Sequence, residues 1–196
     1  MSGRAAVFLD RDGVLNALVP DVLSGKPESP LRVQDVELLA GVPSALRELA
    51  GTGFLLVGVS NQPGVAKGRV TREQLDAVQA RVLALLAAEG VELDDFRLCL
   101  HHPEGSSAEL GIACECRKPA PGMLLDAGAD LGIDLKRSWM IGDTDADVAA
   151  GLAAGTMTVL IEHPASGHKR SGAHAPTALA DDLPHAVRSI LDGSGS

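Results

Sequence analysis

Aromatic residues are scarce in this sequence, which has no tyrosine, one tryptophan and three phenylalanines among its 196 residues. The hydrophobic share is nevertheless 45%, as in an ordinary globular domain, so alanine, valine and leucine must build the core. A chain of this length buries most of its apolar surface on folding. We therefore expect one domain over residues 1–192, followed by a flexible Gly-Ser tail at 193–196.

Positive charge is scarce as well. The 17 lysines and arginines are outnumbered by 26 aspartates and glutamates, which gives a formal charge of −9. Nucleic-acid binding depends on clustered lysine and arginine, so DNA or RNA is not expected as a partner. This excess of negative charge still allows a small anionic substrate, because a few lysine or arginine side chains at one site can bind it.

Long hydrophobic runs are absent from the N-terminal region. Residues 5–9 give only five apolar positions before Asp10, too few for a signal peptide or a membrane span. We expect no membrane partner and a cytoplasmic location. In that reducing compartment the three cysteines are thiols or metal ligands rather than disulfides. Without a conspicuous apolar surface helix, the simplest expectation is a monomer.

Short apolar runs and helical spacing alternate along the chain. The runs predict buried strands at 5–10, 54–60, 97–101, 138–142 and 157–161. The helical spacing predicts helices at 43–50, 71 to about 90, 121–131, 145–154 and 183–191. Thr71 and Gln74 carry the signature of a capping box. This alternation predicts an α/β fold with Rossmann-like layers and a mostly parallel sheet flanked by helices.

Polar side chains follow three of the predicted strands. Asp10, the Ser60-Asn61 pair and Asp143 each lie where an apolar strand gives way to a polar, glycine-containing loop. Ligands of such sheets bind beyond the carboxyl ends of the strands. The three segments are therefore expected to meet at one edge of the sheet.

The first of these segments contains two acidic residues, Asp10 and Asp12. In extended chain they face the same side while Arg11 points away. Adjacent carboxylates repel unless a cation or a proton lies between them. Mg²⁺ prefers oxygen ligands, and Asp143 would supply a third carboxylate. The alternative is that Asp10 caps a turn that Asp12 and the following glycine form.

Two further segments carry groups suited to phosphate. The hydroxyl and backbone amides of Ser60-Asn61-Gln62-Pro63-Gly64 suit a phosphate oxygen, although the same residues are common in turns. Arg117 and Lys118 are adjacent cations before a predicted helix, where a solvated surface pair is the alternative.

The ordered set of motifs is more specific than any one of them. Asp-x-Asp, Ser-Asn, a lysine before a helix and Gly-Asp-x-x-x-Asp together resemble the haloacid dehalogenase superfamily of phosphotransfer enzymes over nearly the whole chain. The resemblance implies that Asp10 is a nucleophile that forms an aspartyl-phosphate, and that Asp12 is the general acid and then base. It also implies that Ser60 and Lys118 steady the phosphoryl group.

The same resemblance implies a magnesium site. Its ligands would be the side chains of Asp10 and Asp143 and the backbone carbonyl of Asp12. Asp147, one helical turn beyond Asp143, is expected to orient the loop rather than bind the metal.

All three cysteines lie within eighteen positions. Cys99, His101, Cys114 and Cys116 make a complete tetrahedral set for a structural Zn²⁺, with no position open for catalysis. His102 is an alternative to His101. In the other interpretation Cys99 is a buried strand residue and the other two cysteines are incidental. Zinc would fix a long loop and bring Arg117 and Lys118 to the site.

This cysteine loop narrows the resemblance. Cys-x-His-His-Pro-Glu-Gly through Cys-x-Cys-Arg-Lys-Pro is similar to the D-glycero-D-manno-heptose 1,7-bisphosphate phosphatases, as are the stretches 60–69 and 180–183. The resemblance implies removal of the phosphate at C7 and no large cap domain. It also implies substrate binding by Arg117 and Lys118, with Asn61 and Gln62 in the matching Ser-Asn-Gln stretch.

Two departures leave the sugar and its anomer open. Residues 17–20 replace a Gly-Tyr-Val segment of that family, and Thr144 replaces a frequent lysine. Histidinol-phosphate phosphatase is the nearest alternative activity. A DNA 3′-phosphatase is disfavoured by the net charge, and a non-enzymatic metabolite-binding protein is disfavoured because every catalytic position holds a competent residue.

Overall fold

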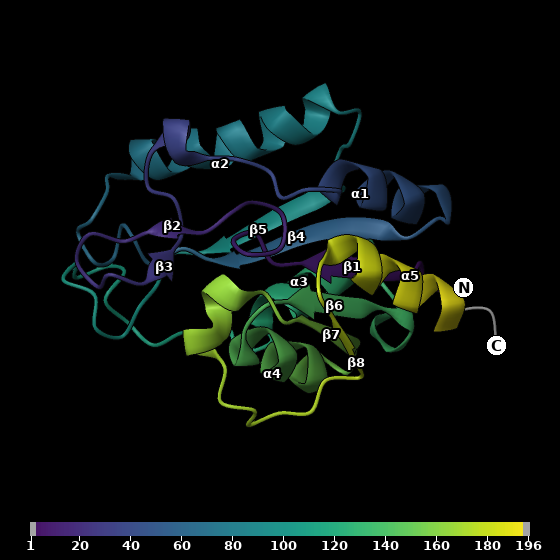
Figure 1. Cartoon of the computed structure of the whole chain (residues 1–196). Helices are drawn as coiled ribbons and strands as arrows, with labels where there is room; N and C mark the ends of the chain where they lie inside the picture. The colour runs from purple at the N-terminus through teal and green to yellow at the C-terminus, as the bar shows by residue number, and fades with distance from the viewer. Residues whose placement is uncertain (1–2, 194–196) are drawn as a thin grey trace.

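The computed structural model describes residues 3–193, and a six-stranded sheet runs through the centre of the molecule (Figure 1). The strand order is β5-β4-β1-β6-β7-β8, and every pairing is parallel. The bounds are β1 Ala6–Leu9, β4 Leu55–Asn61, β5 Asp95–Cys99, β6 Trp139–Gly142, β7 Met157–Ile161 and β8 Ala178–Ala180. The predicted α/β fold with a parallel sheet is confirmed.

Helices cover both faces of the sheet (Figure 1). On one face lie α1 Val42–Gly51, α2 Arg72–Ala88 and α5 Leu183–Gly193; on the other lie α3 Gly122–Leu131 and α4 Asp145–Ala154. Side chains of β1 alternate between the two layers. Val7 and Leu9 pack with the first group of helices, while Ala6 and Phe8 pack with the second. Because both faces are buried at the centre of the sheet, β1 and β6 have continuous apolar sequences.

The five predicted helices are all present, and α4 has the predicted bounds. The capping box of α2 is also confirmed: the Gln74 N–H donates to Thr71 Oγ1 at 3.2 Å, and the Thr71 N–H donates to Gln74 Oε1 at 2.9 Å. The prediction for β5 was two residues late, since the strand pairs with β4 from Asp95 and ends at Cys99.

Several short elements were not predicted. They are β8, the hairpin of β2 Val19–Pro20 and β3 Pro27–Glu28, and 3-10 helices at Val33–Asp35, Leu135–Arg137 and Pro164–Lys169. Elements of two or three residues are too short to show a hydrophobic period. The hairpin and the helix Pro164–Lys169 matter here because each contributes to the site.

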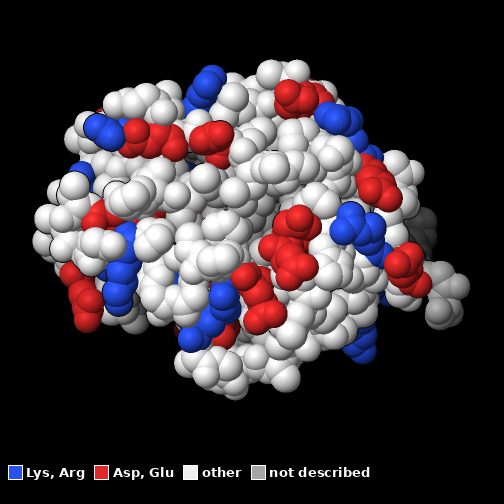
Figure 2. Space-filling view, viewed as in Figure 1, with Lys and Arg blue, Asp and Glu red and all other residues white. Residues whose placement is uncertain are grey.

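Long loops follow β1, β5 and β7 at the carboxyl edge of the sheet, where a cap domain would be inserted. Basic and acidic side chains are interspersed on the face shown in Figure 2, and the basic ones form no continuous surface there. Among the described helices, none has the length and apolar character of a membrane span. Of the expected tail, Gly193 belongs to α5, and 194–196 lie outside the described residues.

Candidate active site

A cavity of about 340 Å³ opens at the carboxyl ends of β1, β4 and β6. Seven of its lining residues have a predicted catalytic, substrate-binding or metal-binding role: Asp10, Asp12, Ser60, Asn61, Arg117, Lys118 and Asp143. Thr144 and Asp147, also singled out in the sequence, line it as well. The expected convergence of three strand ends is therefore present. Gln62 was also singled out but is not among the lining residues; it donates hydrogen bonds to Asp12 and Ser60, which are.

Lys118 is the central cation of the site. Its ammonium Nζ lies 2.9 Å from Asp10 Oδ1 and 2.6 Å from Asp147 Oδ1, and it donates to the carbonyl of Val59 at 2.7 Å. The side chain is 3% exposed. Burial opposes its charge, yet Asp10 and Asp147 raise the pKa of Lys118 above its usual value. The lysine is therefore held as a fixed positive charge beside Asp10.

Asp10 lies directly after β1, where its N–H donates to the carbonyl of Ile141 in β6 at 3.0 Å. Burial raises the pKa of Asp10 to about 6 against the opposing charge of Lys118, and Asp147 and Asp12 add to the rise. A buried carboxylate fixed by strand backbone and paired with a lysine is suited to nucleophilic attack on phosphorus.

Asp12 is held by a network that the sequence did not predict. Arg11 Nε and Nη2 each donate to the Asp12 carboxylate at 3.1 Å, and Asn16 Nδ2 and Gln62 Nε2 donate at 2.9 and 2.6 Å. Arg11 itself is fully buried, and its Nη1 donates to Gln79 Oε1 of α2 at 3.1 Å. Burial would raise the pKa of Asp12, but Arg11 and the hydrogen bonds lower it below its usual value.

Asn61 and Gln62 were predicted to bind substrate, and the structure gives both a supporting position. Asn61 Nδ2 donates to the carbonyl of Lys118 at 2.8 Å, and the N–H of Lys118 donates to Asn61 Oδ1 at 3.0 Å. Gln62 Nε2 donates to Asp12 and, at 2.9 Å, to Ser60 Oγ. Their amides thus place Lys118, Asp12 and Ser60. Asn61 also lines the cavity and Gln62 is not among its lining residues, and direct substrate contact by either stays a prediction.

Asp143 follows β6 and is 1% exposed, and neither of its carboxylate oxygens has a hydrogen-bond partner. Burial and the neighbouring Asp10 raise the pKa of Asp143 well above its usual value. One oxygen each of Asp10, Asp143 and Asp147 lie within 4.8 Å of one another. An unpartnered buried carboxylate beside a second one fits a hard cation, since Mg²⁺ is bound through one or two carboxylates.

Asp147 is the third residue of the capping box of α4. Its Oδ2 accepts from the N–H of Thr144 at 3.1 Å and from Thr144 Oγ1 at 2.6 Å, while its other oxygen pairs with Lys118. Gly142 permits this approach, because a Cβ there would lie 2.1 Å from the Asp147 Cβ. These contacts agree with the expectation that Asp147 orients the loop.

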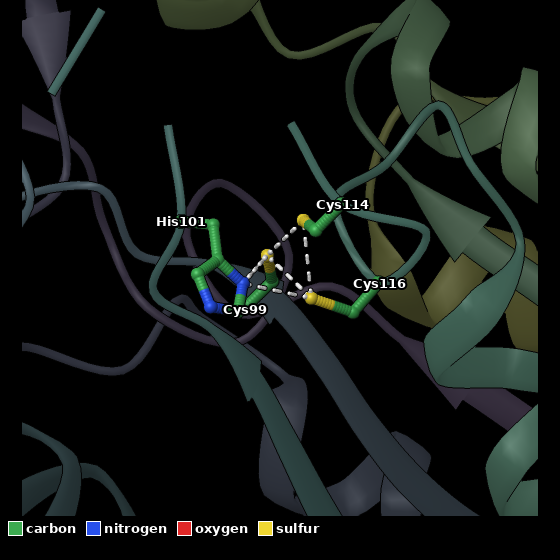
Figure 3. A group of neighbouring side chains, drawn as sticks. All are labelled: Cys99, His101, Cys114 and Cys116. Carbon is green, nitrogen blue, oxygen red and sulfur yellow. Dashed lines mark hydrogen bonds between the residues drawn. The ribbon is translucent and has the colours of Figure 1, made fainter. Parts of the chain in front are cut away.

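The three cysteines and His101 form a cluster whose side chains point toward one another (Figure 3). Cys99 Sγ lies 3.6 Å from Cys114 Sγ and 2.9 Å from Cys116 Sγ, and His101 Nδ1 lies 3.3 Å from Cys116 Sγ. All three cysteines are free, since a disulfide would bring two sulfurs to about 2.05 Å. The four donor atoms lie within 4.8 Å of one another.

The cluster fits a tetrahedral zinc ion in its donor set. His101 rather than His102 belongs to it, because His102 Nδ1 lies apart and accepts from the N–H of Glu104 at 3.1 Å. Burial, with the neighbouring Cys99 and Cys114, raises the pKa of Cys116, and burial raises the pKa of Cys99, so a bound cation would favour the thiolate forms of these two residues. Arg117 follows at once and its Nη1 donates to the carbonyl of His101 at 3.2 Å.

Four further residues line the cavity without having been predicted. Glu28 and Ser29 come from the hairpin β2–β3 and its exit, Lys67 from the loop after β4, and Lys169 from the helix Pro164–Lys169. Glu28, Ser29 and Lys169 lie in or beside elements too short to show a hydrophobic period, so no spacing rule distinguishes them from ordinary surface. Lys67 lies in the stretch 60–69 that resembles the phosphatase family, but no role was predicted for it.

The parallel sheet, the buried aspartates and the lysine define a hydrolase of the HAD-like class. A family model described as HAD-hydrolase-like matches residues 115–186. The D-glycero-beta-D-manno-heptose-1,7-bisphosphate 7-phosphatase of Yersinia pestis is 40% identical over 186 residues, which cover 93% of this chain and 95% of that protein. The protein of the same name from Escherichia coli (strain K12) is 38% identical, with 93% of each chain covered.

A solved structure supports the same relation. The D,D-heptose 1,7-bisphosphate phosphatase from B. bronchiseptica, complexed with magnesium and phosphate, has a TM-score of 0.80 and 27% identity, with 96% of this chain and 99% of that chain covered. The chain belongs to the D-glycero-beta-D-manno-heptose-1,7-bisphosphate 7-phosphatase family of HAD phosphatases.

Proposed function

We propose that the protein hydrolyses the C7 phosphate of D-glycero-β-D-manno-heptose 1,7-bisphosphate through an aspartyl-phosphate at Asp10. The observation that carries the proposal is the arrangement of Asp10, which is paired with Lys118 at 2.9 Å and lies near the unpartnered carboxylate of Asp143. Curated relatives at 38–40% identity over nearly the whole chain carry this activity in their names and specify the β anomer.

In the first step an Asp10 carboxylate oxygen attacks phosphorus, and the bond from phosphorus to the sugar oxygen breaks. Asp12 gives a proton to the departing sugar oxygen, which leaves as an alcohol. Lys118 places its charge beside the transferring group, and Ser60 lines the cavity with its hydroxyl held by Gln62. Fixed charges of this kind supply a large part of the stabilisation in phosphoryl transfer.

In the second step Asp12 takes a proton from water, which attacks phosphorus and breaks its bond to Asp10. Inorganic phosphate leaves and Asp12 holds the proton for the next cycle. The contacts with Arg11, Asn16 and Gln62 favour the carboxylate form of Asp12, the form that a base requires.

We propose Mg²⁺ as the catalytic cofactor, held by the side chains of Asp10 and Asp143 and the backbone carbonyl of Asp12. When bound, the ion supplies positive charge to the phosphoryl oxygens. The unpartnered Asp143 carboxylate supports this assignment, and a related phosphatase was crystallised with magnesium and phosphate.

We also propose a structural Zn²⁺ on Cys99, His101, Cys114 and Cys116, with Arg117 and Lys118 placed by its loop. The close packing of three free cysteines and one imidazole nitrogen supports the site. Thiolate ligands agree with the predicted cytoplasmic location. The protein is proposed to act as a monomer, which light scattering coupled to size-exclusion chromatography should report as the mass of one chain.

Phosphate release from a substrate panel tests the activity. The panel is the β and α anomers of the heptose 1,7-bisphosphate and histidinol phosphate, assayed with Mg²⁺. The β bisphosphate should give the highest kcat/KM, and Asp10→Asn should abolish release while the circular dichroism spectrum stays unchanged. A higher kcat/KM for histidinol phosphate would overturn the substrate assignment, and unchanged turnover by Asp10→Asn would overturn the mechanism.

A further inference from the structure

Glu28 and Lys169 meet at the mouth of the cavity although they are 141 positions apart. Lys169 Nζ donates to Glu28 Oε2 at 2.7 Å, and His168 Nε2 lies 3.8 Å from Glu28 Oε1. The Glu28 and Lys169 side chains are about one third exposed, at 35% and 29%. We name the Glu28–Lys169 ion pair the clasp.

The two sides of the clasp differ in how firmly they are held. Arg170, next to Lys169, donates from Nη1 to the carbonyls of Asp143, Ile161 and His163 at 3.0–3.4 Å. The lysine side is therefore fixed to the strand ends that carry the catalytic residues.

The glutamate side belongs to the two-stranded hairpin β2–β3, which pairs through Val19–Glu28 and Pro20–Pro27 and is tied to the loop after β4 by the ion pair of Asp21 with Arg69. A second cavity of about 300 Å³ lies against this hairpin, and Val22 at its turn is 96% exposed. A hairpin this short is marginal without packing, so we expect Glu28 to move away from Lys169 more readily than Lys169 moves beside Arg170, while the Asp21–Arg69 pair holds the turn of the hairpin.

The charges around the cavity are unequal. Its catalytic end holds Asp10, Asp12, Asp143 and Asp147 with Lys118, whereas the remaining charged lining residues are Lys67, Arg117, Lys169 and Glu28. A phosphate monoester carries about −1.5 to −2 charges at neutral pH. A substrate with two phosphates thus needs further cations for the phosphate that is not removed, and Glu28 is the one carboxylate among these four described lining residues.

We propose that Lys169 binds the second phosphate of the substrate and that Glu28 is its exchangeable counter-ion. This inference rests on the proposed bisphosphatase function. Before binding, Glu28 neutralises Lys169 and keeps the ammonium at the mouth of the cavity. The second phosphate replaces the Glu28 carboxylate on Lys169, and the hairpin side releases. A substrate with a single phosphate leaves the clasp closed, so the exchange selects bisphosphates.

The test compares kcat and KM for the heptose 1,7-bisphosphate and for the same sugar carrying only the C7 phosphate. Lys169→Gln should lower the ratio of kcat/KM between the bisphosphate and the monophosphate by about tenfold to a hundredfold, mainly through KM, since a hydrogen bond to a charged group is lost. Glu28→Gln should raise that ratio by about twofold to fivefold, because the Glu28 carboxylate no longer competes with the second phosphate for Lys169 and an exposed ion pair is weak. It should have no such effect when Lys169→Gln is already present.

Lys136→Gln and Glu92→Gln make the same chemical changes at exposed positions just before β6 and β5, at the opposite edge of the sheet. Both should keep the ratio of the unchanged protein. Two results would overturn this inference and leave the proposed function standing. One is an equal loss of kcat/KM on the bisphosphate and the monophosphate in Lys169→Gln. The other is the same effect of Glu28→Gln on the ratio whether or not Lys169→Gln is present. Hydrolysis of monophosphates without any activity on the bisphosphate would overturn the proposed substrate and the clasp together.

Discussion

Gly13 lies against the side chain of Asp143, a residue that lines the cavity. Gly13 has a φ of +87°, and a Cβ at that position would lie 2.1 Å from Asp143 Oδ2. Gly13→Ala is therefore expected to displace a carboxylate that we assign to Mg²⁺. We expect kcat/KM for the bisphosphate to fall by at least about tenfold, which corresponds to about 1.4 kcal/mol of transition-state stabilisation. Phosphate release at saturating Mg²⁺ measures the change.

Gly155 offers a matched control for the backbone effect. It has a φ of +81° at the end of α4, and a Cβ there would meet nothing within 4 Å. Gly155→Ala should cost about 1–2 kcal/mol of folding stability through the left-handed conformation and leave kcat/KM within about twofold. Equal losses of activity in the two variants would mean that backbone strain, not the displacement of Asp143, is responsible.

Arg11 supports Asp12 from inside the protein. Arg11→Met is expected to reduce the free energy of unfolding by about 3–5 kcal/mol, because it leaves the buried Asp12 carboxylate without its counter-ion. Adding Asp12→Asn should recover part of that loss, and urea unfolding measures both. Arg72→Met breaks an exposed pair with Asp76 and should cost only about 0.5 kcal/mol. A loss that is purely additive in the double variant would contradict the pairing argument.

Single residues differ in how well the sequence reveals them. Asp10 and Asp143 are visible because a charge directly follows an apolar strand. Gln79 is not visible in this way, because it is one of several polar residues in α2. It lies 68 positions from Arg11 in the sequence and contacts it only after the helix packs on the sheet. The orientation of the Arg11 guanidinium toward Asp12 likewise cannot be predicted from strand alternation. That rule gives only the direction in which a side chain leaves the backbone.

The cysteine loop is the element whose stability we assign to a metal. Cys114→Ser removes one of four ligands, so purified protein should lose most of its zinc, which we expect at about one ion per chain without the change. Because Arg117 and Lys118 follow the last ligand directly, kcat/KM should fall by at least about tenfold as well. Metal analysis and phosphate release test the two expectations.

Glu115 lies between two of the cysteines and is exposed, which makes it a suitable control. Glu115→Gln should keep both the zinc and the activity. If Cys114→Ser protein contained no zinc and hydrolysed the bisphosphate normally, the proposed role of the metal in placing Lys118 would be wrong.

Whole elements were predicted where their patterns are long. The helix α2 has 17 residues with a capping box, and α4 begins at a second capping box formed by Thr144 and Asp147. The hairpin β2–β3 has two residues in each strand, including two prolines, and the loop around it gave no period. Its position depends on tertiary contacts such as the ion pair of Asp21 with Arg69, which local sequence does not encode.

At the scale of the described molecule, three separate loops supply charged residues that line the cavity around the proposed catalytic aspartates. The hairpin contributes Glu28, the cysteine loop contributes Arg117, and the segment after β7 contributes Lys169. The topology of the sheet follows from the sequence because alternating strands and helices allow few arrangements. The meeting of the loops does not, since it depends on contacts between positions up to 141 residues apart.

Mg²⁺ is expected to stabilise the entire fold, because it binds carboxylates that come together only in the folded chain. At a concentration a hundredfold above its Kd, a ligand of the folded state adds about 2.7 kcal/mol to the free energy of unfolding. For a chain of this size that corresponds to a rise in Tm of about 5–10 °C. Differential scanning calorimetry with and without Mg²⁺ measures the shift.

Asp143→Asn should abolish most of this rise in Tm. The same variant should unfold at a higher temperature than the unchanged protein when no Mg²⁺ is added, because it removes a buried charge whose oxygens have no hydrogen-bond partner. Asp126→Asn, an exposed change on α3, should leave the Mg²⁺ shift intact. A full Mg²⁺ shift in Asp143→Asn protein would place the cation elsewhere. Opposite effects of Asp143→Asn on Tm with and without Mg²⁺ would show that the Asp143 carboxylate destabilises the metal-free fold and stabilises the fold when Mg²⁺ is bound.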